Sequence, residues 1–161
     1  MSNGRTKLVG LVGVTAAAVL LSYVPLKESG PGGPKLVPYT DAVGVRTVCD
    51  GITKKVEERL YTKEECDKLL AEELYAHADG ALRCLTKPTT PNQRAAYTSF
   101  AYNVGVTAFC RSTLVKKHNL GDNWGACAEL PKWVYGGTTI LPGLVIRRKE
   151  ERALCEKDLK K

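Results

Sequence analysis

Three polar residues in the first third of the chain, Glu28, Asp41 and Thr47, have the types needed for chemistry on a sugar bond. Asp41 and Thr47 lie within residues 38–49, a short strand-like run that also contains turn-forming residues. Glu28 is the only acidic residue among the first forty. Two carboxyl groups that flank a cleft can hydrolyse a glycosidic bond, because one protonates the leaving oxygen while the other activates water. The alternative is structural: Asp41 caps a turn before Gly44, and Thr47 fills a strand position.

The composition predicts a disulfide-bonded protein of one ordinary domain. The chain has 161 residues, enough for one hydrophobic core. Its formal net charge of +7 suits a polyanion such as nucleic acid, anionic lipid or an anionic cell-wall polymer. The basic residues are scattered and no nucleic-acid-binding motif accompanies them, so we do not expect a nucleic-acid partner. Six cysteines without a Cys-x-x-Cys pair, and only two histidines, favour disulfides in an oxidising compartment over zinc. We expect neither a metal nor a cofactor.

Residues 1–26 are predicted to be a signal-anchor segment. Residues 8–24 carry no charge and follow Arg5 and Lys7, which is the pattern of an export signal. Glycines and other small residues interrupt the apolar run, and they lower the free energy that holds a helix in lipid. Such a segment could be inserted by the export machinery and later leave the bilayer. An ordinary uncleaved anchor and a cleaved signal peptide are the alternatives.

The rest of the chain reads as a linker followed by an α+β domain. Residues 27–35 form a Gly/Pro-rich linker that carries Glu28, and residues 36–161 form the expected globular domain. Residues 36–53 have the β-branched residues and spaced glycines of a small hairpin or three-stranded sheet.

The helical part of this domain is expected to begin with a long connecting helix. Thr62 and Glu65 form a predicted capping box, and the helix that follows should run to about Leu85. Further helices are predicted over residues 92–102, 112–118, 124–133 and 144–159. The layout is a small β lobe and a helical lobe joined by the long helix.

Four motifs in chain order resemble those of phage-type lysozymes. Residues 38–53 (PYTDAVGVRTVCDGIT) are similar to the active-site hairpin of that family, and residues 61–66 (YTKEEC) to the start of its interlobe helix. Residues 99–105 (SFAYNVG) resemble its helical-lobe core motif, and residues 143–155 (GLVIRRKEERALC) resemble its C-terminal helix. The weakly apolar leader is similar to that of signal-anchor-release phage endolysins.

The resemblance implies a lysozyme-like two-lobe fold and hydrolysis of the β-1,4 bond between N-acetylmuramic acid and N-acetylglucosamine in peptidoglycan. The family's catalytic set is a glutamate, an aspartate and a threonine, and Asp41 and Thr47 match the last two in type and spacing. The glutamate departs from the pattern, because Gly32 stands at its usual place and Glu28 precedes Asp41 by 13 positions. Ile52 stands where the family often has histidine.

In this hypothesis Glu28 is the general acid, which must keep its proton through partial burial near apolar groups. Ionised Asp41 activates water on the opposite face of the sugar, and Thr47 orients this water through its hydroxyl. These roles correspond to an inverting glycoside hydrolase.

The cysteine pairing is also a hypothesis. The family layout would place one disulfide between the hairpin and the interlobe helix, and another between the C-terminal helices. We take the chain-order pairing, which is Cys49–Cys66, Cys84–Cys110 and Cys127–Cys155.

Several other polar or aromatic residues have structural explanations. His77 and His118 have no acid or nucleophile signature beside them and are predicted to be structural. Trp124 and Trp133 are expected to pack the helical lobe or to rim a sugar subsite. The Arg147-Arg148 pair is expected on a solvated helix face, with one of the two arginines bridged to Glu151.

Together these features predict a monomeric, exported phage endolysin that acts on peptidoglycan and lyses the host. Its leader would hold it at first in the host inner membrane, with Glu28 away from Asp41, and release would make it active in the periplasm. The alternative, which the displaced glutamate supports, is a catalytically inactive lysozyme fold that serves as a peptidoglycan-binding or membrane-anchored scaffold.

Overall fold

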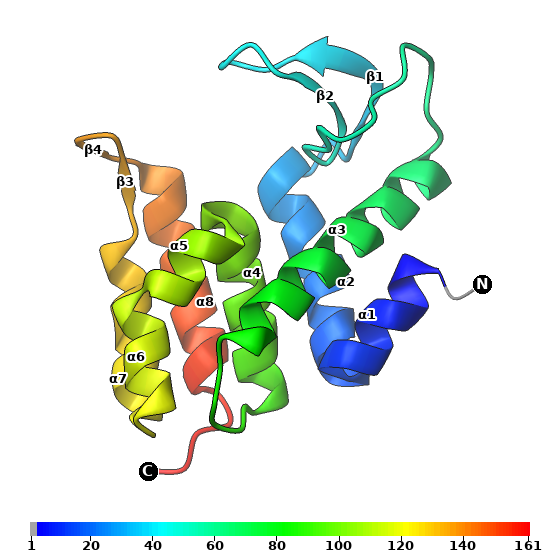
Figure 1. The fold of residues 1–161 in the computed structure, drawn as a ribbon. Coiled ribbons are helices and arrows are strands. Elements are labelled where there is room, and N and C mark those ends of the chain that lie inside the picture. The colour runs from blue at the N-terminus through cyan, green and yellow to red at the C-terminus, as the bar shows by residue number, and fades with distance from the viewer. Residues whose placement is uncertain (1–2) are drawn as a thin grey trace.

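The apolar leader folds into two short helices that belong to the body of the molecule (Figure 1). The structure, a computed structural model, describes residues 3–161. Helix α1 covers Gly4–Val12 and α2 covers Val14–Ser29. Gly13 separates them with a φ of +88°, a left-handed conformation that glycine adopts without steric cost. Of the helices formed by residues 3–161, none is long and apolar enough to cross a membrane.

A hydrophobic cluster joins both leader helices to the long helix α3 (Lys63–Arg83) and to α4 (Pro91–Val104). Leu8 and Leu20 are fully buried in it, and burying one such side chain contributes about 1.5–3 kcal/mol. The other buried members are Val12, Ala16, Ala17, Val24, Leu70, Leu74, Ala78 and Ala95. In this structure the leader therefore completes a hydrophobic core. The division of the chain at residues 26 and 35 stays a prediction.

The β lobe is a two-stranded antiparallel hairpin of β1 (Lys35–Thr40) and β2 (Arg46–Cys49). Tyr39 pairs with Thr47, and the register shifts between Lys35 and Tyr39, where Pro38 offers no N–H to the ladder. The connection from α2 is shorter than the linker predicted over 27–35. The helix continues to Ser29, so residues 30–34 alone connect it to β1.

Helix α3 joins the two lobes, as predicted (Figure 1). Its capping box is present: the Thr62 hydroxyl accepts from the Glu65 N–H at 3.1 Å, and the Glu65 carboxylate accepts from the Thr62 N–H at 2.8 Å. The helix ends at Arg83, slightly before the predicted Leu85.

The helical lobe is built around α4, whose Tyr97 and Phe100 are fully buried and contact Phe109. Four further helices surround it, namely α5 (Val106–Arg111), α6 (Thr113–Asn119), α7 (Asn123–Glu129) and α8 (Pro142–Glu156). A 3-10 helix, η1 (Leu130–Lys132), and a second small hairpin of β3 (Tyr135–Gly136) and β4 (Thr139–Ile140) connect α7 to α8. We did not predict this hairpin, although a Gly-Gly pair is a hairpin signal.

The disulfide hypothesis is confirmed. Cys49–Cys66 links β2 to α3, Cys84–Cys110 links the end of α3 to α5, and Cys127–Cys155 links α7 to α8.

The histidines and tryptophans that the sequence singled out have structural partners. His118 is fully buried, with its Nδ1 3.1 Å from the Tyr97 hydroxyl. The Nδ1 of His77 lies 2.7 Å from the carbonyl oxygen of Glu73 in the preceding turn of α3. Trp133 packs against Phe100, whereas the indole N–H of the half-exposed Trp124 donates to the Lys160 carbonyl.

Candidate active site

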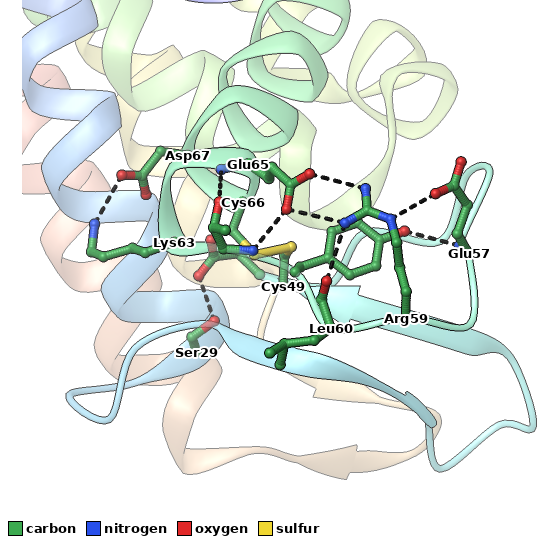
Figure 2. The surroundings of a disulfide bond; sticks show 12 residues. Ser29, Cys49, Glu57, Arg59, Leu60, Lys63, Glu65, Cys66 and Asp67 are labelled. Atoms are coloured by element: carbon green, nitrogen blue, oxygen red, sulfur yellow. Dashed lines mark hydrogen bonds and ion pairs between the residues drawn. A yellow bond between two sulfur atoms is a disulfide. The ribbon is translucent and has the colours of Figure 1, made fainter.

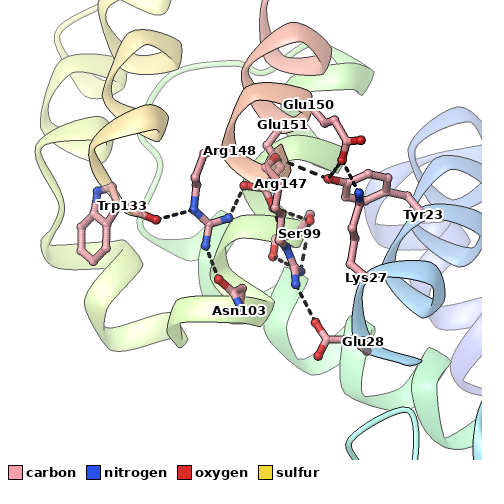
Figure 3. Close-up of polar contacts among 10 residues, drawn as sticks. All are labelled: Tyr23, Lys27, Glu28, Ser99, Asn103, Trp133, Arg147, Arg148, Glu150 and Glu151. Atoms are coloured by element: carbon pink, nitrogen blue, oxygen red, sulfur yellow. Dashed lines mark hydrogen bonds and ion pairs between the residues drawn. The ribbon is translucent and has the colours of Figure 1, made fainter. Parts of the chain in front are cut away.

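The last turn of α2 presents the Glu28 carboxylate to Arg147 of α8 (Figure 3). Its Oε1 accepts from Arg147 Nη1 at 2.8 Å, and the side chain is 22% exposed. We expected apolar groups around this carboxyl. The structure instead provides a guanidinium partner, contributed by a residue 119 positions later in the chain.

Arg147 is itself fixed by a buried polar network. Its Nε donates to Glu151 Oε1 at 3.1 Å, and its Nη2 donates to the Ser99 carbonyl at 3.3 Å. The Ser99 hydroxyl donates to the same Glu151 oxygen at 2.7 Å. Burial alone would lower the pKa of Arg147, but the carboxylates of Glu28 and Glu151 outweigh it and raise the pKa. Arg147 is therefore a permanently charged anchor for Glu28.

The prediction for the two adjacent arginines was wrong about their surroundings. Arg147 and Arg148 are buried, and both form ion pairs with Glu151 rather than one alone. Arg148 also donates to the Trp133 carbonyl at 3.0 Å and to the side chain of Asn103. Helical spacing predicted the pairs within α8, but it carried no information on the partners from α2 and α4.

Asp41 sits where the first hairpin turns. Its Oδ1 accepts from the N–H groups of Val43 and Val45 at 3.0 and 2.8 Å, and its carbonyl accepts from the Gly44 N–H. The structural role considered for Asp41 is thus present. It occupies one carboxylate oxygen only, because no residue within 3–161 donates a hydrogen bond to Oδ2.

Thr47 lies at the start of β2, across the hairpin from Tyr39. Its residue is 3% exposed, and its hydroxyl donates to the Val45 carbonyl at 3.0 Å. Because the hydroxyl proton is held by the backbone, its lone pairs are the groups that can receive a hydrogen from water.

Two observations place the end of α2 beside the turn that follows β2. Gly51 in this turn has a φ of +85°, and a Cβ there would lie 3.9 Å from Glu28 Oε2. The Ser29 hydroxyl donates to Asp50 Oδ1 at 2.5 Å, close to the Cys49–Cys66 disulfide (Figure 2). Despite its longer spacing in the sequence, Glu28 therefore lies beside the β lobe that carries Asp41 and Thr47.

Asp50 was not recognised from the sequence. It is 2% exposed, and burial raises its pKa, which the hydrogen bond from Ser29 only partly offsets. An acidic residue directly after a disulfide cysteine carries no distinctive signal, so its burial became visible only in the fold. No group of three or more His, Cys, Asp or Glu residues within 3–161 is arranged to hold a metal ion.

Comparison with known proteins extends over most of the chain. The model of the phage lysozyme family matches residues 31–151, a span that includes Asp41 and Thr47 and begins just after Glu28. A SAR-endolysin of Enterobacteria phage PA-2 is 39% identical over 145 residues, which cover 89% of this chain and 88% of that protein.

Two solved structures of one endolysin, Lyz of phage P1, share the fold. The active form has a TM-score of 0.77 at 23% identity, and the match covers 98% of this chain and 93% of that chain. The secreted inactive form has a TM-score of 0.56 at 20% identity, with 96% of each chain covered. From the family match and the sequence identity, this chain belongs to the phage lysozyme family.

Proposed function

We propose that Glu28, Asp41 and Thr47 form the catalytic site of this endolysin, which cleaves the β-1,4 bond between N-acetylmuramic acid and N-acetylglucosamine in peptidoglycan. Family membership and the identity to SAR-endolysins make the protein a muramidase of the endolysin type. The observation that supports this site best is the seating of Glu28 against Arg147 and beside Gly51, at the junction of the two lobes.

In each of the two carboxylates, the contacts suggest that one oxygen is held by the protein and the other is available for the reaction. Arg147 occupies Oε1 of Glu28, so Oε2, on the side of Gly51, is the oxygen that we assign to protonation of the leaving sugar oxygen. Oδ1 of Asp41 is held by backbone N–H groups, which assigns water activation to Oδ2. Thr47 accepts a hydrogen from the same water. This arrangement would invert the configuration at the cleaved carbon.

The first test separates a muramidase from a peptidoglycan-binding scaffold. Purified wild-type protein is incubated with peptidoglycan, and new reducing ends are counted alongside the amount of protein bound. We expect reducing ends that carry N-acetylmuramic acid, and their loss in Asp41→Asn. Binding without new reducing ends would favour the scaffold.

The leader supplies a mechanism of control. We propose that it first anchors the protein in the host inner membrane, facing the periplasm, and that the protein acts as a monomer on peptidoglycan after release. While residues 8–24 lie in lipid, they cannot fill the hydrophobic cluster against α3 and α4. The turn that carries Glu28 is then not held in the position it has in this structure. The higher TM-score with the active than with the secreted inactive form of P1 Lyz is consistent with a released conformation here.

This control is tested on the full-length chain, because deleting the leader would open the core that α1 and α2 complete. Vesicle-embedded and released fractions of the same preparation are compared for specific activity on soluble peptidoglycan fragments. Activity should be confined to the released fraction. Equal specific activity in both fractions would rule out control by the leader.

A further inference from the structure

A second charged contact lies directly beside the Glu28–Arg147 pair. Lys27 Nζ lies 2.5 Å from Glu150 Oε2 of α8, and the Tyr23 hydroxyl donates to the same oxygen at 2.8 Å (Figure 3). The Lys27 ammonium also lies 5.2 Å from the centre of the Tyr23 ring. Tyr23, Lys27 and Glu150 thus form a compact contact between the end of α2 and α8, which we call the α2–α8 clasp.

We propose that Glu150 is a positioning residue for Glu28, acting through the α2–α8 clasp. The proposal rests on the proposed function, because it assumes that Glu28 transfers a proton. Glu150 does not reach the reacting atoms in this assignment. It fixes the rotation and height of the helical turn from which Glu28 extends.

The order of charges permits only one seating of α2 on α8. Lys27 and Glu28 are adjacent on α2, while their partners Glu150 and Arg147 are three residues apart on one face of α8. Turning α2 by one residue, about 100°, would bring Lys27 toward Arg147 in one direction and Glu28 toward Glu150 in the other. Either new contact would join like charges, which repel. The clasp and the catalytic ion pair therefore select the same orientation.

The end of α2 needs this support because its backbone is weakly held. Pro25 lies inside the helix and has no N–H to donate to the preceding turn. Leu26 is 58% exposed and contributes little packing, and the glycine-containing loop 30–34 follows at once. Side-chain contacts to α8 therefore restrain this turn together with the Ser29–Asp50 hydrogen bond. A displacement of about 1 Å in a reacting group can cost about a hundredfold in rate.

The protonation states suit the clasp at neutral pH. Burial opposes ionisation of Glu150, but the hydrogen bonds from Lys27 and Tyr23 outweigh it and lower the pKa of Glu150. Burial and the bond to Glu150 raise the pKa of Tyr23, so the phenol remains a donor. The Glu150 side chain is 43% exposed, and such pairs add little to folding stability. Removing the Lys27–Glu150 pair should therefore lower kcat and leave the melting temperature nearly unchanged.

The experiment compares Glu150→Gln, Lys27→Gln and the double variant with wild type, using kcat and KM on soluble peptidoglycan fragments and thermal melts. Each single variant should lower kcat about tenfold, equivalent to ~1.4 kcal/mol in the barrier, with KM changed by less than about twofold. Because the two residues form one contact, the double variant should lose no more than either single variant. Lys27→Arg keeps the charge and should retain wild-type kcat.

Glu156→Gln is the matched control, since Glu156 forms an ion pair with Arg152 on the same helix and is not part of the clasp. It should keep wild-type kcat. The proposal is overturned if Glu150→Gln leaves kcat unchanged, if the losses add in the double variant, or if kcat falls only in proportion to the folded fraction. An inactive wild type would instead refute the proposed function, so the two failures are distinguishable.

Discussion

At the scale of single residues, the ion pair between Glu28 and Arg147 is the contact on which the proposed mechanism depends most. Glu28 lies in the last turn of α2, the second helix formed by the leader and the residues that follow it, and Arg147 lies in the last helix, so the pair joins segments 119 positions apart. Arg147 is buried, whereas Glu28 is partly exposed to solvent, so the pair contributes less to folding stability than a fully buried pair would. Arg147 is therefore needed chiefly for the location of the Glu28 carboxylate.

The assigned roles predict the stereochemistry of the product. If Asp41 activates water on the face opposite the leaving group, the first N-acetylmuramic acid released has the α configuration at its anomeric carbon. Proton NMR of early time points, before mutarotation, measures this. A β-anomer as the first product would contradict direct attack of water and indicate a covalent intermediate.

Asp50→Asn should stabilise the protein at neutral pH. Burial raises the folded-state pKa of Asp50, so ionisation costs the folded state increasingly as the pH rises from the unfolded pKa of about 3.9. Asparagine removes this charge and can still accept from Ser29. Urea unfolding should show a gain at pH 7 that disappears near pH 3. The exposed Glu64→Gln is the control, and a gain of equal size at both pH values would contradict the explanation.

At the scale of elements, local sequence patterns correctly predicted the features that depend only on neighbouring residues, such as helix caps and turns. The capping box at Thr62 and the hairpin around Asp41 were correct, because caps and turns are encoded within a few positions. The packing of α2 against α3 and α4 was not predicted. A run of alanines, valines and leucines between Leu8 and Val24 suits a bilayer and also suits a groove between α3 and α4, so its composition does not choose between them. The contacts of Arg147 and Asp50 likewise depend on distant segments.

Two glycines of the leader should respond oppositely to alanine. Gly13 adopts a φ of 88° and a ψ of 162° between α1 and α2, a region almost restricted to glycine, where a side chain costs about 1–3 kcal/mol. Gly10 lies in the exposed interior of α1, where an added Cβ would meet no atom within 4 Å, so Gly10→Ala should stabilise by about 0.5–1 kcal/mol. Thermal melts of the released protein would measure both. A stabilising Gly13→Ala would contradict the broken leader helix.

At the scale of the whole molecule, the leader is the third contributor to a structure otherwise made of a hairpin lobe and a helical lobe. Its helices fill the hydrophobic cluster against α3 and α4, and its last turn delivers Glu28 to the lobe junction. In the proposed mechanism, the step that completes the core therefore also completes the site. Three disulfides hold the remaining segments together independently of the leader.

Two of these disulfides should have different effects when replaced by serines. Removing either Cys49–Cys66 or Cys127–Cys155 should lower the free energy of unfolding by about 2–4 kcal/mol. Only the first ties the hairpin with Asp41 and Thr47 to α3, so only its loss should reduce the kcat of the folded fraction. Equal kcat losses in both variants would contradict this assignment.

The most direct test of the central claim, that the leader carries the catalytic acid, is the kcat of Glu28→Gln on peptidoglycan. Glutamine keeps an oxygen for Arg147 but cannot transfer a proton, and loss of a general acid costs about 10²–10⁴-fold. We predict a loss of this size in a variant that melts near the wild-type temperature, with Glu64→Gln unchanged. A folded Glu28→Gln protein with kcat within about threefold of wild type would contradict the claim.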